Sequence, residues 1–361
     1  MSSLRVAVIG AGHLGRIHSK LLASVDGAKL VAIADPIEPA RKQAAEMFDV
    51  DVYEDYRDCI DQIDAAVIAA PTDSHAEIAT DLLLAGKHLL VEKPLAMSAD
   101  EANKLAMLAQ SHRLTLQVGH VERFNPAFTA LGDVAVEPKY VEAVRASRFP
   151  GRCLDVGVVM DLMIHDIDLV CAMTDANVTH IAASGLAVVS DHEDLAEARL
   201  EFECGLVANL KASRISPSPA RSMQVYGPGG FADVDFSGPS LSRVCPSGDI
   251  VHRTFQLDAE TDQPLGYADT LFERHLAEAT SELEPRNAIL EELHDFVISV
   301  QSGSMPTVDG FAGARAVTVA EQILDAIKQR QWYADASPLE SGALASVRSR
   351  IEESSRLRRA A

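Results

Sequence analysis

The sequence predicts a two-domain α/β protein, in which a doubly wound parallel sheet is followed by an α+β domain with a large, open, mostly antiparallel sheet. Three observations predict this. An apolar strand at 4–9 runs into a glycine-rich turn, strands and helices then alternate to about residue 120, and from Tyr140 polar and apolar residues alternate instead. Apolar strands joined by helices are typical of a parallel sheet covered on both faces, whereas polar–apolar alternation is typical of half-exposed strands.

The glycine-rich turn directly follows the first strand. It reads Gly10-Ala11-Gly12-His13-Leu14-Gly15, ahead of a predicted helix at 13–24. A second apolar run at 30–34 ends in Asp35, twenty residues past Gly15. Strand, G-x-G-x-x-G turn, helix, strand and acid in this order are the fingerprint of a Rossmann domain that binds a dinucleotide.

Each position of this turn has a physical reason. Gly10 permits the tight turn, Gly12 lets the backbone approach a pyrophosphate, and Gly15 lets helix and strand pack closely. His13 and Leu14 begin the helix, whose free N–H groups and positive dipole face the phosphates. We therefore expect these residues to bind the cofactor.

The acid at the end of the second strand discriminates between cofactors. Asp35 would accept hydrogen bonds from the adenine ribose hydroxyls and would repel a 2′-phosphate. No arginine directly follows it, because the next residue is Pro36. NAD is therefore predicted as the cofactor, and NADP is disfavoured.

The rest of the first domain continues the alternation of strands and helices. Ser98 and Glu101 form a capping box ahead of its last helix. Further strands are predicted at 65–69, 88–91 and 114–118, and helices at 40–48, 76–85 and 100–110.

The pattern changes after Asn125-Pro126. Residues 199–211 alternate polar and apolar side chains around Gly205, which predicts a hairpin with Leu200, Phe202 and Cys204 on one face. Further strands are predicted at 222–226 and 231–236, and helices at 288–302 and 313–330. The predicted domains are a Rossmann domain at 1–122, a substrate-binding and oligomerisation domain at 123–332, and a polar tail without assigned role at 333–361.

Composition narrows the class of protein. The formal net charge of −21 and pI of about 4.9 argue against general nucleic-acid binding, which needs a basic surface. Five scattered cysteines without a C-x-x-C pair indicate neither a disulfide framework nor a zinc site. No apolar run reaches the length of a membrane span, and the N-terminus shows no secretory signal. We expect a cytoplasmic protein without a membrane or nucleic-acid partner.

Two loops after predicted strands add candidate cofactor contacts, because such loops line the ligand crevice of a doubly wound sheet. The first contains Pro71, Thr72 and His75; Thr72 or Asp73 could also cap the next helix. The second is Glu92-Lys93-Pro94, where the proline favours an extended Lys93 and would aim its ammonium into the crevice. An isolated lysine is normally a solvated surface charge, but this position favours a functional one.

A third motif lies in the second domain. Asp161 and His165 are four residues apart on a predicted helix and therefore share one face. An imidazole one turn from a carboxylate suits proton transfer near neutral pH, and its combination with Lys93 favours catalysis over a structural histidine. A metal site is the weaker reading, because no cysteine or second histidine lies at ligand spacing, and we predict no metal.

These motifs in this order resemble the glucose-fructose oxidoreductase/inositol dehydrogenase (Gfo/Idh/MocA) family. The resemblance covers about residues 4 to 330 and is carried by the glycine turn, by Glu92-Lys93-Pro94 and by Asp161-x-x-x-His165. It implies an N-terminal Rossmann domain, a C-terminal domain with a large open sheet, and oxidation of a sugar or cyclitol hydroxyl with NAD(P). It also implies catalytic roles for Lys93, Asp161 and His165.

A narrower resemblance comes from residues 118–126 and 157–168. Together they look like the branch that oxidises the 3-hydroxyl of UDP-N-acetylglucosamine or its uronic acid, ahead of 3-amino-sugar synthesis for lipid A or surface polysaccharide. Val158 and Val159 stand where many relatives carry a glycine-richer run.

A cationic segment fits a nucleotide-sugar. Arg145, Arg148 and Arg152 lie within eight residues and could bind a diphosphate, or they could pair with acids of a neighbouring subunit on an edge strand. Arg123 and Asn125 could bind sugar hydroxyls or fix the crossover between the domains.

The resulting hypothesis is an NAD-dependent dehydrogenase. His165 would take the hydroxyl proton, Asp161 would support the imidazole, and Lys93 would stabilise charge on the reacting oxygen. Lys93 could instead be the base if burial lowers its pKa. The alternatives are a dehydrogenase of a free sugar or inositol, reduction of a diol or imine, and a non-catalytic NAD-binding sensor. A homodimer or homotetramer through the open sheet is expected.

Overall fold

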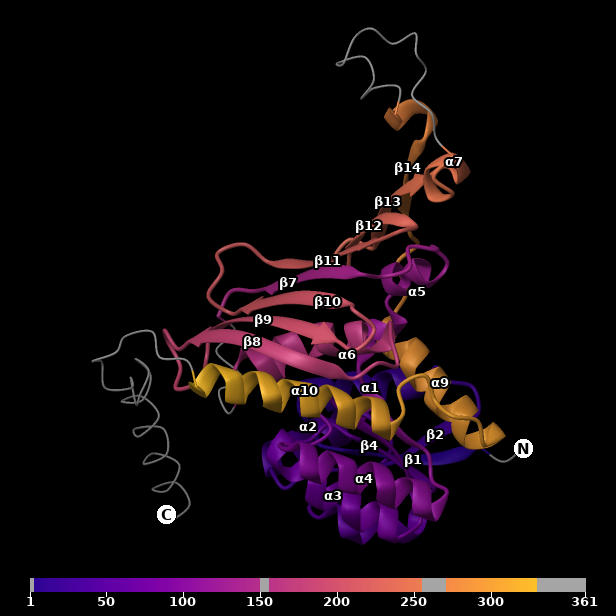
Figure 1. Ribbon diagram of the computed structural model, residues 1–361. Coiled ribbons are helices and arrows are strands. Elements are labelled where there is room, and N and C mark those ends of the chain that lie inside the picture. The colour runs from indigo at the N-terminus through magenta and orange to yellow at the C-terminus, as the bar shows by residue number, and fades with distance from the viewer. Residues whose placement is uncertain (1–2, 150–155, 255–270, 330–361) are drawn as a thin grey trace, which may run out of the picture. The chain divides into compact units, whose positions relative to one another are not determined.

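The computed structural model describes residues 3–149, 156–254 and 271–329, which form two compact units (Figure 1). Within the described residues, the first unit runs to Pro126 and resumes over 285–321, and the second comprises 127–284 and the residues from Gln322 onward. The predicted boundary at residue 122 lies near the break at Pro126. Residues 285–321 belong to the first unit, although the sequence pattern assigned them to the second domain.

The first unit is built on a six-stranded sheet in the order β3-β2-β1-β4-β5-β6. All neighbouring strands are parallel, which confirms the predicted doubly wound Rossmann domain. The inner strands are buried on both faces, as their unbroken apolar sequences predict. The strands are β1 (Leu4–Ile9), β2 (Ala28–Ala34), β3 (Asp51–Tyr53), β4 (Ala65–Ile68), β5 (His88–Glu92) and β6 (Leu116–Gly119).

Helices join these strands and cover the sheet. Ser98 is confirmed as the N-cap of α4: its Oγ accepts from the Glu101 amide and donates to the Glu101 carboxylate, in place of the reciprocal bond from the Ser98 amide that completes a capping box. The helical segments of this unit are α1 (His13–Leu22), α2 (Glu38–Met47), η1 (Tyr56–Gln62), α3 (Thr72–Leu84), α4 (Ala99–His112), η2 (Val121–Phe124), α9 (Ala288–Ser302) and most of α10 (Gly310–Gln329).

Helix α9 explains why residues 285–321 return to the first unit. Leu293, Phe296 and Val297 are buried in the same apolar cluster as Val6, Val8 and Leu22 of β1 and α1. Gln117 of β6 donates to the main-chain oxygen of Glu292 at 3.0 Å. Removing α9 would expose this apolar surface to water, so the helix is part of the Rossmann core.

The second unit contains an eight-stranded sheet in the order β14-β13-β12-β11-β7-β10-β9-β8. Every neighbouring pair is antiparallel except β7 and β10, which are parallel. The prediction of a large, mostly antiparallel sheet is therefore confirmed. The strands are β7 (Tyr140–Ala146), β8 (Val178–Leu186), β9 (Leu195–Phe202), β10 (Val207–Ser213), β11 (Ala220–Gly227), β12 (Gly230–Asp235), β13 (Ser240–Pro246) and β14 (Leu276–Glu282).

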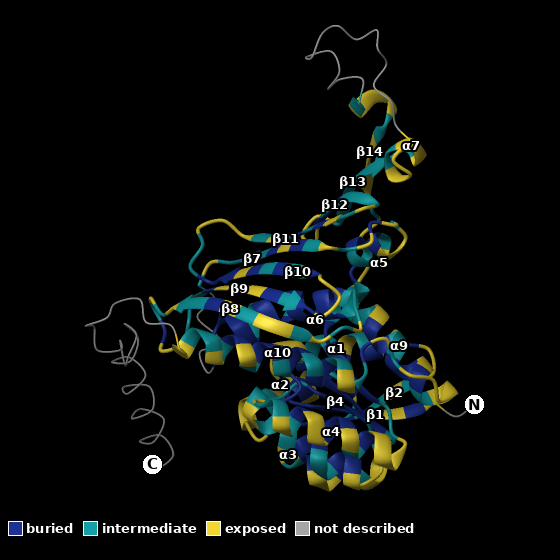
Figure 2. Cartoon of the chain, viewed as in Figure 1, coloured by how far each residue is buried: buried dark blue, intermediate teal, exposed yellow. Residues whose placement is uncertain are grey.

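One face of this sheet is covered and the other is open. The segments η3 (Val159–Met163) and α6 (Ile164–Ala172) pack against β7 and β10. Leu200 and Phe202 of β9 point to the covered face as predicted, whereas Cys204 lies exposed in the turn. Figure 2 shows the resulting bands of buried and exposed residues along the strands. Helices α5 (Pro126–Gly132) and α7 (Gly248–Val251) complete the described elements.

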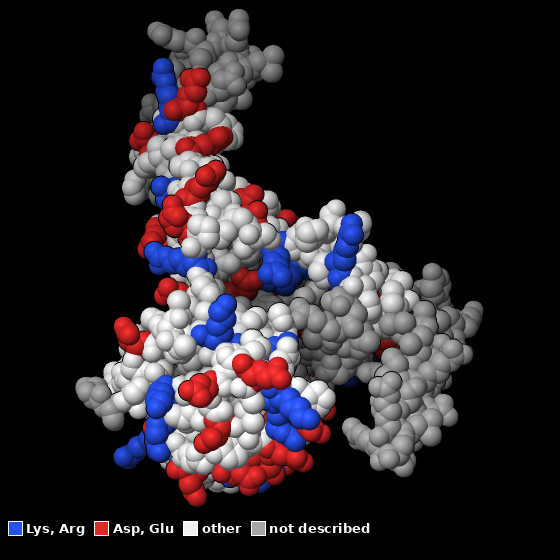
Figure 3. Space-filling model, turned by 180° about the vertical axis from the view of Figure 1, so that it is seen from behind, with Lys and Arg blue, Asp and Glu red and all other residues white. Residues whose placement is uncertain are grey.

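Surface charge and hydropathy agree with the composition. On the face shown in Figure 3, basic side chains lie singly or in small groups among acidic ones. Within the described ranges, no helix combines the length and apolar character needed to cross a membrane. The four cysteines in these ranges, Cys59, Cys171, Cys204 and Cys245, are free thiols.

Candidate cofactor and catalytic sites

The glycine turn between β1 and α1 has the geometry that a dinucleotide site requires. Gly10 has a φ of +102°, and a Cβ there would lie 2.6 Å from the oxygen of Ala69. A Cβ on Gly15 would lie 1.8 Å from the oxygen of Gly10, so helix and strand contact through this glycine. A Cβ on Gly12 would meet nothing within 4 Å. Gly10 and Gly15 thus serve the fold, and Gly12 leaves space for a ligand.

The end of α1 beside this space is exposed. Gly12, His13 and Leu14 are exposed, and Gly12 is the N-cap residue without a side-chain hydrogen bond. The first amides of a helix lack intrahelical partners, so they are available to phosphate oxygens. The residues present therefore fit the pyrophosphate of a dinucleotide.

Asp35 lies at the end of β2, where the fingerprint places it. Its Oδ2 accepts the Ala11 amide at 2.7 Å and its Oδ1 accepts the Ile37 amide at 2.8 Å. The carboxylate thus holds the glycine turn in place, a function that the sequence pattern did not predict. A carboxylate has about four acceptor positions, so capacity for ribose hydroxyls remains.

The loop after β4 needs a correction. Helix α3 begins at Thr72 with Pro71 as N-cap and no side-chain capping bond, so neither Thr72 nor Asp73 caps it. His75 is buried, and its Nδ1 and Nε2 lie 2.9 Å and 3.0 Å from the oxygens of Pro94 and Ala70. Both ring nitrogens are occupied by backbone, so His75 braces two loops and is not placed to contact a cofactor.

Glu92 and Lys93 have different surroundings although they are adjacent at the end of β5. Glu92 is buried, and its Oε1 lies 2.7 Å from Nε2 of His18. Oε1 of Glu92 is therefore bonded inside the fold, and the expected contact of this carboxylate with a cofactor stays a prediction. Lys93 is half-buried and precedes Pro94 through a cis peptide bond.

Asp161 and His165 lie in the second unit, four residues apart in the chain and in two kinds of helix. Asp161 belongs to a π-helical turn, η3, and His165 to the first turn of α6. The prediction of one continuous α-helix is therefore wrong in detail. Both residues are half-buried, whereas Met160 and Met163 are buried. Single π-helical turns are rare and occur frequently at functional sites.

Long-range contacts hold this helical segment. Oε1 of Glu193 accepts the Val159 amide at 3.1 Å, and a Cβ on Gly157 would collide with the Glu193 carboxylate. Burial raises the pKa of Glu193, although the Val159 amide acts in the opposite direction. Glu193 therefore sets the start of η3, and Gly157 is needed to make room for it.

A second anchor is a buried ion pair. Arg145 and Asp166 are 4% and 2% exposed at their side chains, and Nη2 of Arg145 lies 2.8 Å from Oδ1 of Asp166. Asp166 directly follows His165, so this pair ties the start of α6 to β7. Arg145 is thus committed inside the fold, and β7 is an inner strand with β10 and β11 on either side. The expectation of Arg145 as a diphosphate ligand or an edge-strand residue is wrong.

The other residues expected to bind substrate divide into three cases. Arg148 is exposed, with its Nε donating to the oxygen of Pro217 at 3.0 Å. Arg152 lies outside the described residues. Arg123 is half-buried, and Asn125 is buried and donates from Nδ2 to Glu122 at 2.9 Å. Both expected roles of Asn125, binding sugar hydroxyls or fixing the crossover, stay predictions.

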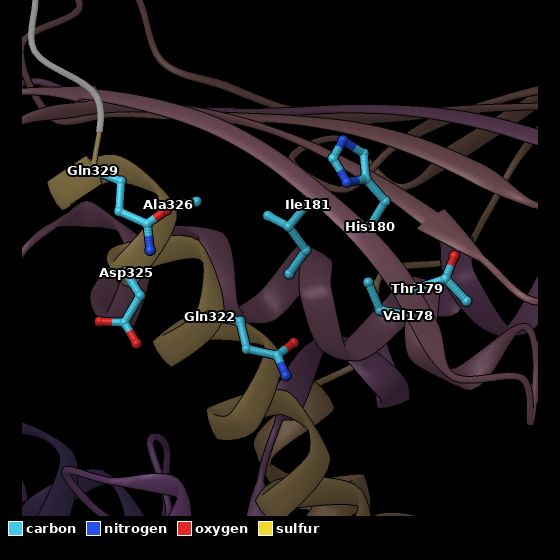
Figure 4. Close-up of a pocket in the computed structure, with 8 residues that line it drawn as sticks. All are labelled: Val178, Thr179, His180, Ile181, Gln322, Asp325, Ala326 and Gln329. Carbon is cyan, nitrogen blue, oxygen red and sulfur yellow. The ribbon is translucent and has the colours of Figure 1, made fainter.

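A pocket of about 310 Å³ lies elsewhere in the second unit, between β8 and the end of α10 (Figure 4). His180 points away from α10, whereas Ile181 lies between the strand and the helix. Its one acidic side chain, Asp325, pairs with Lys328 at 3.1 Å. The residues predicted for cofactor or substrate do not line it, so we do not assign it to the reaction.

Sequence reasoning missed the residues that support the site from a distance. Glu193, Asp194 and Arg214 are examples: Nε of Arg214 lies 2.7 Å from Oδ1 of Asp194, and both side chains are fully buried. Burial alone would raise the pKa of Asp194, but bonds from the Val189 amide and Arg214 lower it to about 2. A charged residue within an otherwise apolar alternation is the signal that could have indicated such pairs.

Comparison with known proteins identifies a family for both parts of the chain. Residues 4–120 match the oxidoreductase family with an NAD-binding Rossmann fold, and residues 138–233 match the Gfo/Idh/MocA C-terminal domain. The chain is 33% identical over 330 residues to UDP-N-acetylglucosamine 3-dehydrogenase of Acidithiobacillus ferrooxidans, covering 91% of this chain and 98% of that protein. It is 31% identical over 235 residues to scyllo-inositol 2-dehydrogenase (NAD+) of Bacillus subtilis, covering 59% of this chain and 68% of that protein.

Solved structures show the same relationship. The structure of the Acidithiobacillus ferrooxidans enzyme aligns with a TM-score of 0.79 at 32% identity, covering 91% of this chain and 99% of that chain. An oxidoreductase from Agrobacterium radiobacter in complex with NAD+ aligns with a TM-score of 0.74 at 20% identity, covering 91% of this chain and 97% of that chain. At 20% identity, the second likeness shows a common fold and nothing more.

Proposed function

This chain belongs to the Gfo/Idh/MocA oxidoreductase family, and we propose that it oxidises the 3-hydroxyl of UDP-N-acetylglucosamine, or of a closely related UDP-sugar, with NAD+ as the oxidant. The observation that carries this proposal is the likeness to UDP-N-acetylglucosamine 3-dehydrogenase over nearly the whole of both chains. The family is one of NAD-binding dehydrogenases, so the reaction type and cofactor follow from membership. The 3-keto product is suited to amination in the synthesis of a 3-amino sugar.

The cofactor side of the proposed site is the glycine turn. Bound NAD+ would accept the hydride from the substrate carbon. Gly12, His13 and Leu14 bind its pyrophosphate, Asp35 binds the adenine ribose, and the loop at Pro71 and Thr72 borders the crevice. The roles of these residues are supported by the open space at Gly12 and by the exposure of the helix terminus.

Three side chains act on the reacting alcohol in this proposal. His165 takes the hydroxyl proton, and Asp161 orients and supports the imidazole. Lys93 donates a hydrogen bond to the reacting oxygen and stabilises negative charge on it. The loss of one proton to His165 and one hydride to NAD+ balances the oxidation of the alcohol to a ketone. Arg123, Arg148 and Arg152 bind the diphosphate or the sugar.

Incubation with NAD+ and a panel of UDP-sugars, free sugars and inositols tests the substrate. We expect NADH absorbance to rise with UDP-N-acetylglucosamine and the product mass to be lower by two hydrogen atoms. Oxidation of inositol or glucose, with no UDP-sugar oxidised, would overturn the proposal. UDP alone supplies an independent readout, because a ligand that binds the folded protein raises its Tm.

A dehydrogenase of a cyclitol is the second candidate, favoured by the likeness to scyllo-inositol 2-dehydrogenase. In that case UDP leaves the Tm unchanged, and inositol supports NADH formation. A non-catalytic NAD-binding protein would bind NAD without turnover of any substrate in the panel.

We also propose that the open face of the eight-stranded sheet joins copies of the chain into a dimer or tetramer. Tyr140, Tyr226 and Phe231 form an aromatic row, with ring centroids 5.8 Å and 4.8 Å apart along it. Light scattering of the purified protein should give a mass of two or four chains.

The free thiols described above also fit a reducing compartment such as the cytoplasm.

A further inference from the structure

Three buried titratable side chains lie together in the first unit, next to the loop that contains Lys93. His18 comes from α1, Glu92 from the end of β5 and Glu292 from α9. All three are buried, and one nitrogen or carboxylate oxygen of each lies within 4.8 Å of the others. We call these residues the buried triad.

The buried triad is incompletely hydrogen-bonded. His18 and Glu92 are joined at 2.7 Å, but Oε1 of Glu292 has no hydrogen-bond partner among the residues described. Glu292 is only 1% exposed, so bulk solvent cannot replace the hydrogen bond that its Oε1 lacks. A buried, ionised carboxylate without a partner is strongly destabilising. Glu292 therefore needs either a proton or a counter-charge.

The two carboxyl groups of the triad respond in opposite ways to this environment. Burial, followed by the charges of Glu92 and Asp295, raises the pKa of Glu292 well above its usual value. Burial also acts to raise the pKa of Glu92, but the hydrogen bond and charge of His18 and the charge of Lys93 lower it. Adjacent carboxyl groups whose pKa values are driven apart divide into one acid and one carboxylate.

Other charged groups surround the triad on each element packed against it. Lys93, directly after β5, and His75 of α3 act on Glu92, and Asp295 of α9 acts on Glu292. Segment η2 also packs against α9. It contributes Glu122 and Arg123, and Glu122 is bonded to Asn125.

We propose that Glu292 is a positioning residue that holds a proton at neutral pH and donates a hydrogen bond toward Glu92 through one bridging water molecule. Glu92 is thereby held by His18 on one side and Glu292 on the other. These two contacts fix the end of β5, directly before Lys93. Because Glu292 is protonated, it adds no second negative charge near Lys93. The inference rests on the proposed role of Lys93 in the reaction.

A divalent cation is the other occupant that a histidine and two glutamates can accept. Two observations favour a proton. The 2.7 Å separation of His18 and Glu92 is that of a direct hydrogen bond. Nδ1 of His18 has no partner among the described residues, whereas a metal-bound histidine almost always donates its second N–H to an acceptor.

Thermal unfolding as a function of pH tests the proton. A group whose pKa is raised on folding stabilises the protein at low pH, and this stability is lost as pH rises through the folded pKa. We expect the Tm of the wild type to fall relative to Glu292→Gln as pH rises from the unfolded pKa of this carboxyl to its raised folded pKa, by about 2–5 °C per pH unit, and to run parallel above it. Glu291→Gln, a change at the exposed neighbouring position, should follow the wild type. Parallel curves for wild type and Glu292→Gln between those two pKa values would overturn the proposal.

Turnover tests the positioning, with whichever substrate of the panel is oxidised. Glu292→Gln retains a donor toward Glu92, so its kcat at pH 7 should stay within about threefold of wild type. The pH at which kcat falls with rising pH should differ between the variant and the wild type. Glu292→Leu has no donor, and its kcat should fall by about tenfold or more with little change in KM for NAD, in line with misplacement of a catalytic group. Equal kcat for the Gln and Leu variants would contradict a positioning role.

Two controls separate the possible failures. Zinc chloride should not raise the Tm of the wild type selectively over Glu292→Gln; a selective rise would show a cation site and overturn the proton. The Tm comparison needs no substrate, so its outcome is independent of the proposed dehydrogenase reaction. Absence of turnover in the wild type would count against that reaction and leave the Tm result to decide whether Glu292 holds a proton.

Discussion

The proposed cofactor side and the helical segment that carries Asp161 and His165 are positioned in different ways. Around the glycine turn, Gly15 and Asp35 act within one strand–turn–helix–strand segment, through a backbone contact and two amide hydrogen bonds. The segment with Asp161 and His165 instead depends on Glu193 and on the pair Arg145–Asp166, whose members are distant in sequence. Local backbone geometry builds the first region, and buried long-range pairs build the second.

The largest effect expected is on turnover. Lys93→Met should lower kcat by about 100- to 10,000-fold, because a positioned acid–base or charge-stabilising group contributes that much. NAD binding, measured by fluorescence titration, should persist. Lys104→Met is the matched control: Lys104 is 73% exposed on α4, pairs with Asp100, and should leave kcat unchanged. Near wild-type kcat in Lys93→Met would show that the first unit contributes no group to the chemistry.

The next effect separates anchoring by buried charge from surface charge. Asp166→Leu leaves the Arg145 guanidinium buried without its partner, and breaking such a pair costs about 3–5 kcal/mol of unfolding free energy. Arg199→Met breaks an exposed pair with Glu201, and the expected change is about 0–1 kcal/mol. Urea unfolding curves measure both. Equal changes would mean that the ion pair at α6 is no more important than one at the surface.

Two glycine variants sharpen the account of the cofactor side. Gly15→Ala forces a Cβ against the Gly10 oxygen and should destabilise the unit by about 1–3 kcal/mol or more. Gly12→Ala meets nothing in the fold, so its Tm should stay near wild type while NAD binds about tenfold more weakly or worse, equivalent to about 1.4 kcal/mol. Calorimetric titration with NAD is the measurement. Unchanged affinity in Gly12→Ala would contradict a pyrophosphate site there.

The smallest expected effect concerns pH. The pKa of Asp194 is lowered to about 2, so the stability that it contributes is present above its unfolded pKa and is lost as pH falls through the folded one. Acid unfolding between about pH 4 and pH 2 should therefore be less steep in Asp194→Asn. This is opposite in sign to the loss of stability with rising pH expected from Glu292. The same acid slope in the variant and the wild type would show that folding does not lower the pKa of Asp194.

The strands and helices that the sequence predicted lie within a few residues of their observed bounds, because their causes are local; β3, β8, β13 and β14 were not predicted. The apolar runs at β1 and β4 and the N-cap contact of Ser98 with Glu101 each lie within one short segment. The alternation around Gly205 likewise predicts β9 and β10, since side chains on a strand point to opposite faces in turn. Membership of the family followed from motifs of the same kind.

The remainder depends on residues that meet only after folding. His18, Glu92 and Glu292 come from three segments, and no local pattern marks Glu292 as the partner of a residue in β5. The return of α9 to the Rossmann core and the π-helical turn at Asp161 were also not predicted. Periodicity records which face of an element is buried. It carries no information about which distant charge will lie opposite, because that is decided by packing and by the cost of leaving a buried charge without a partner.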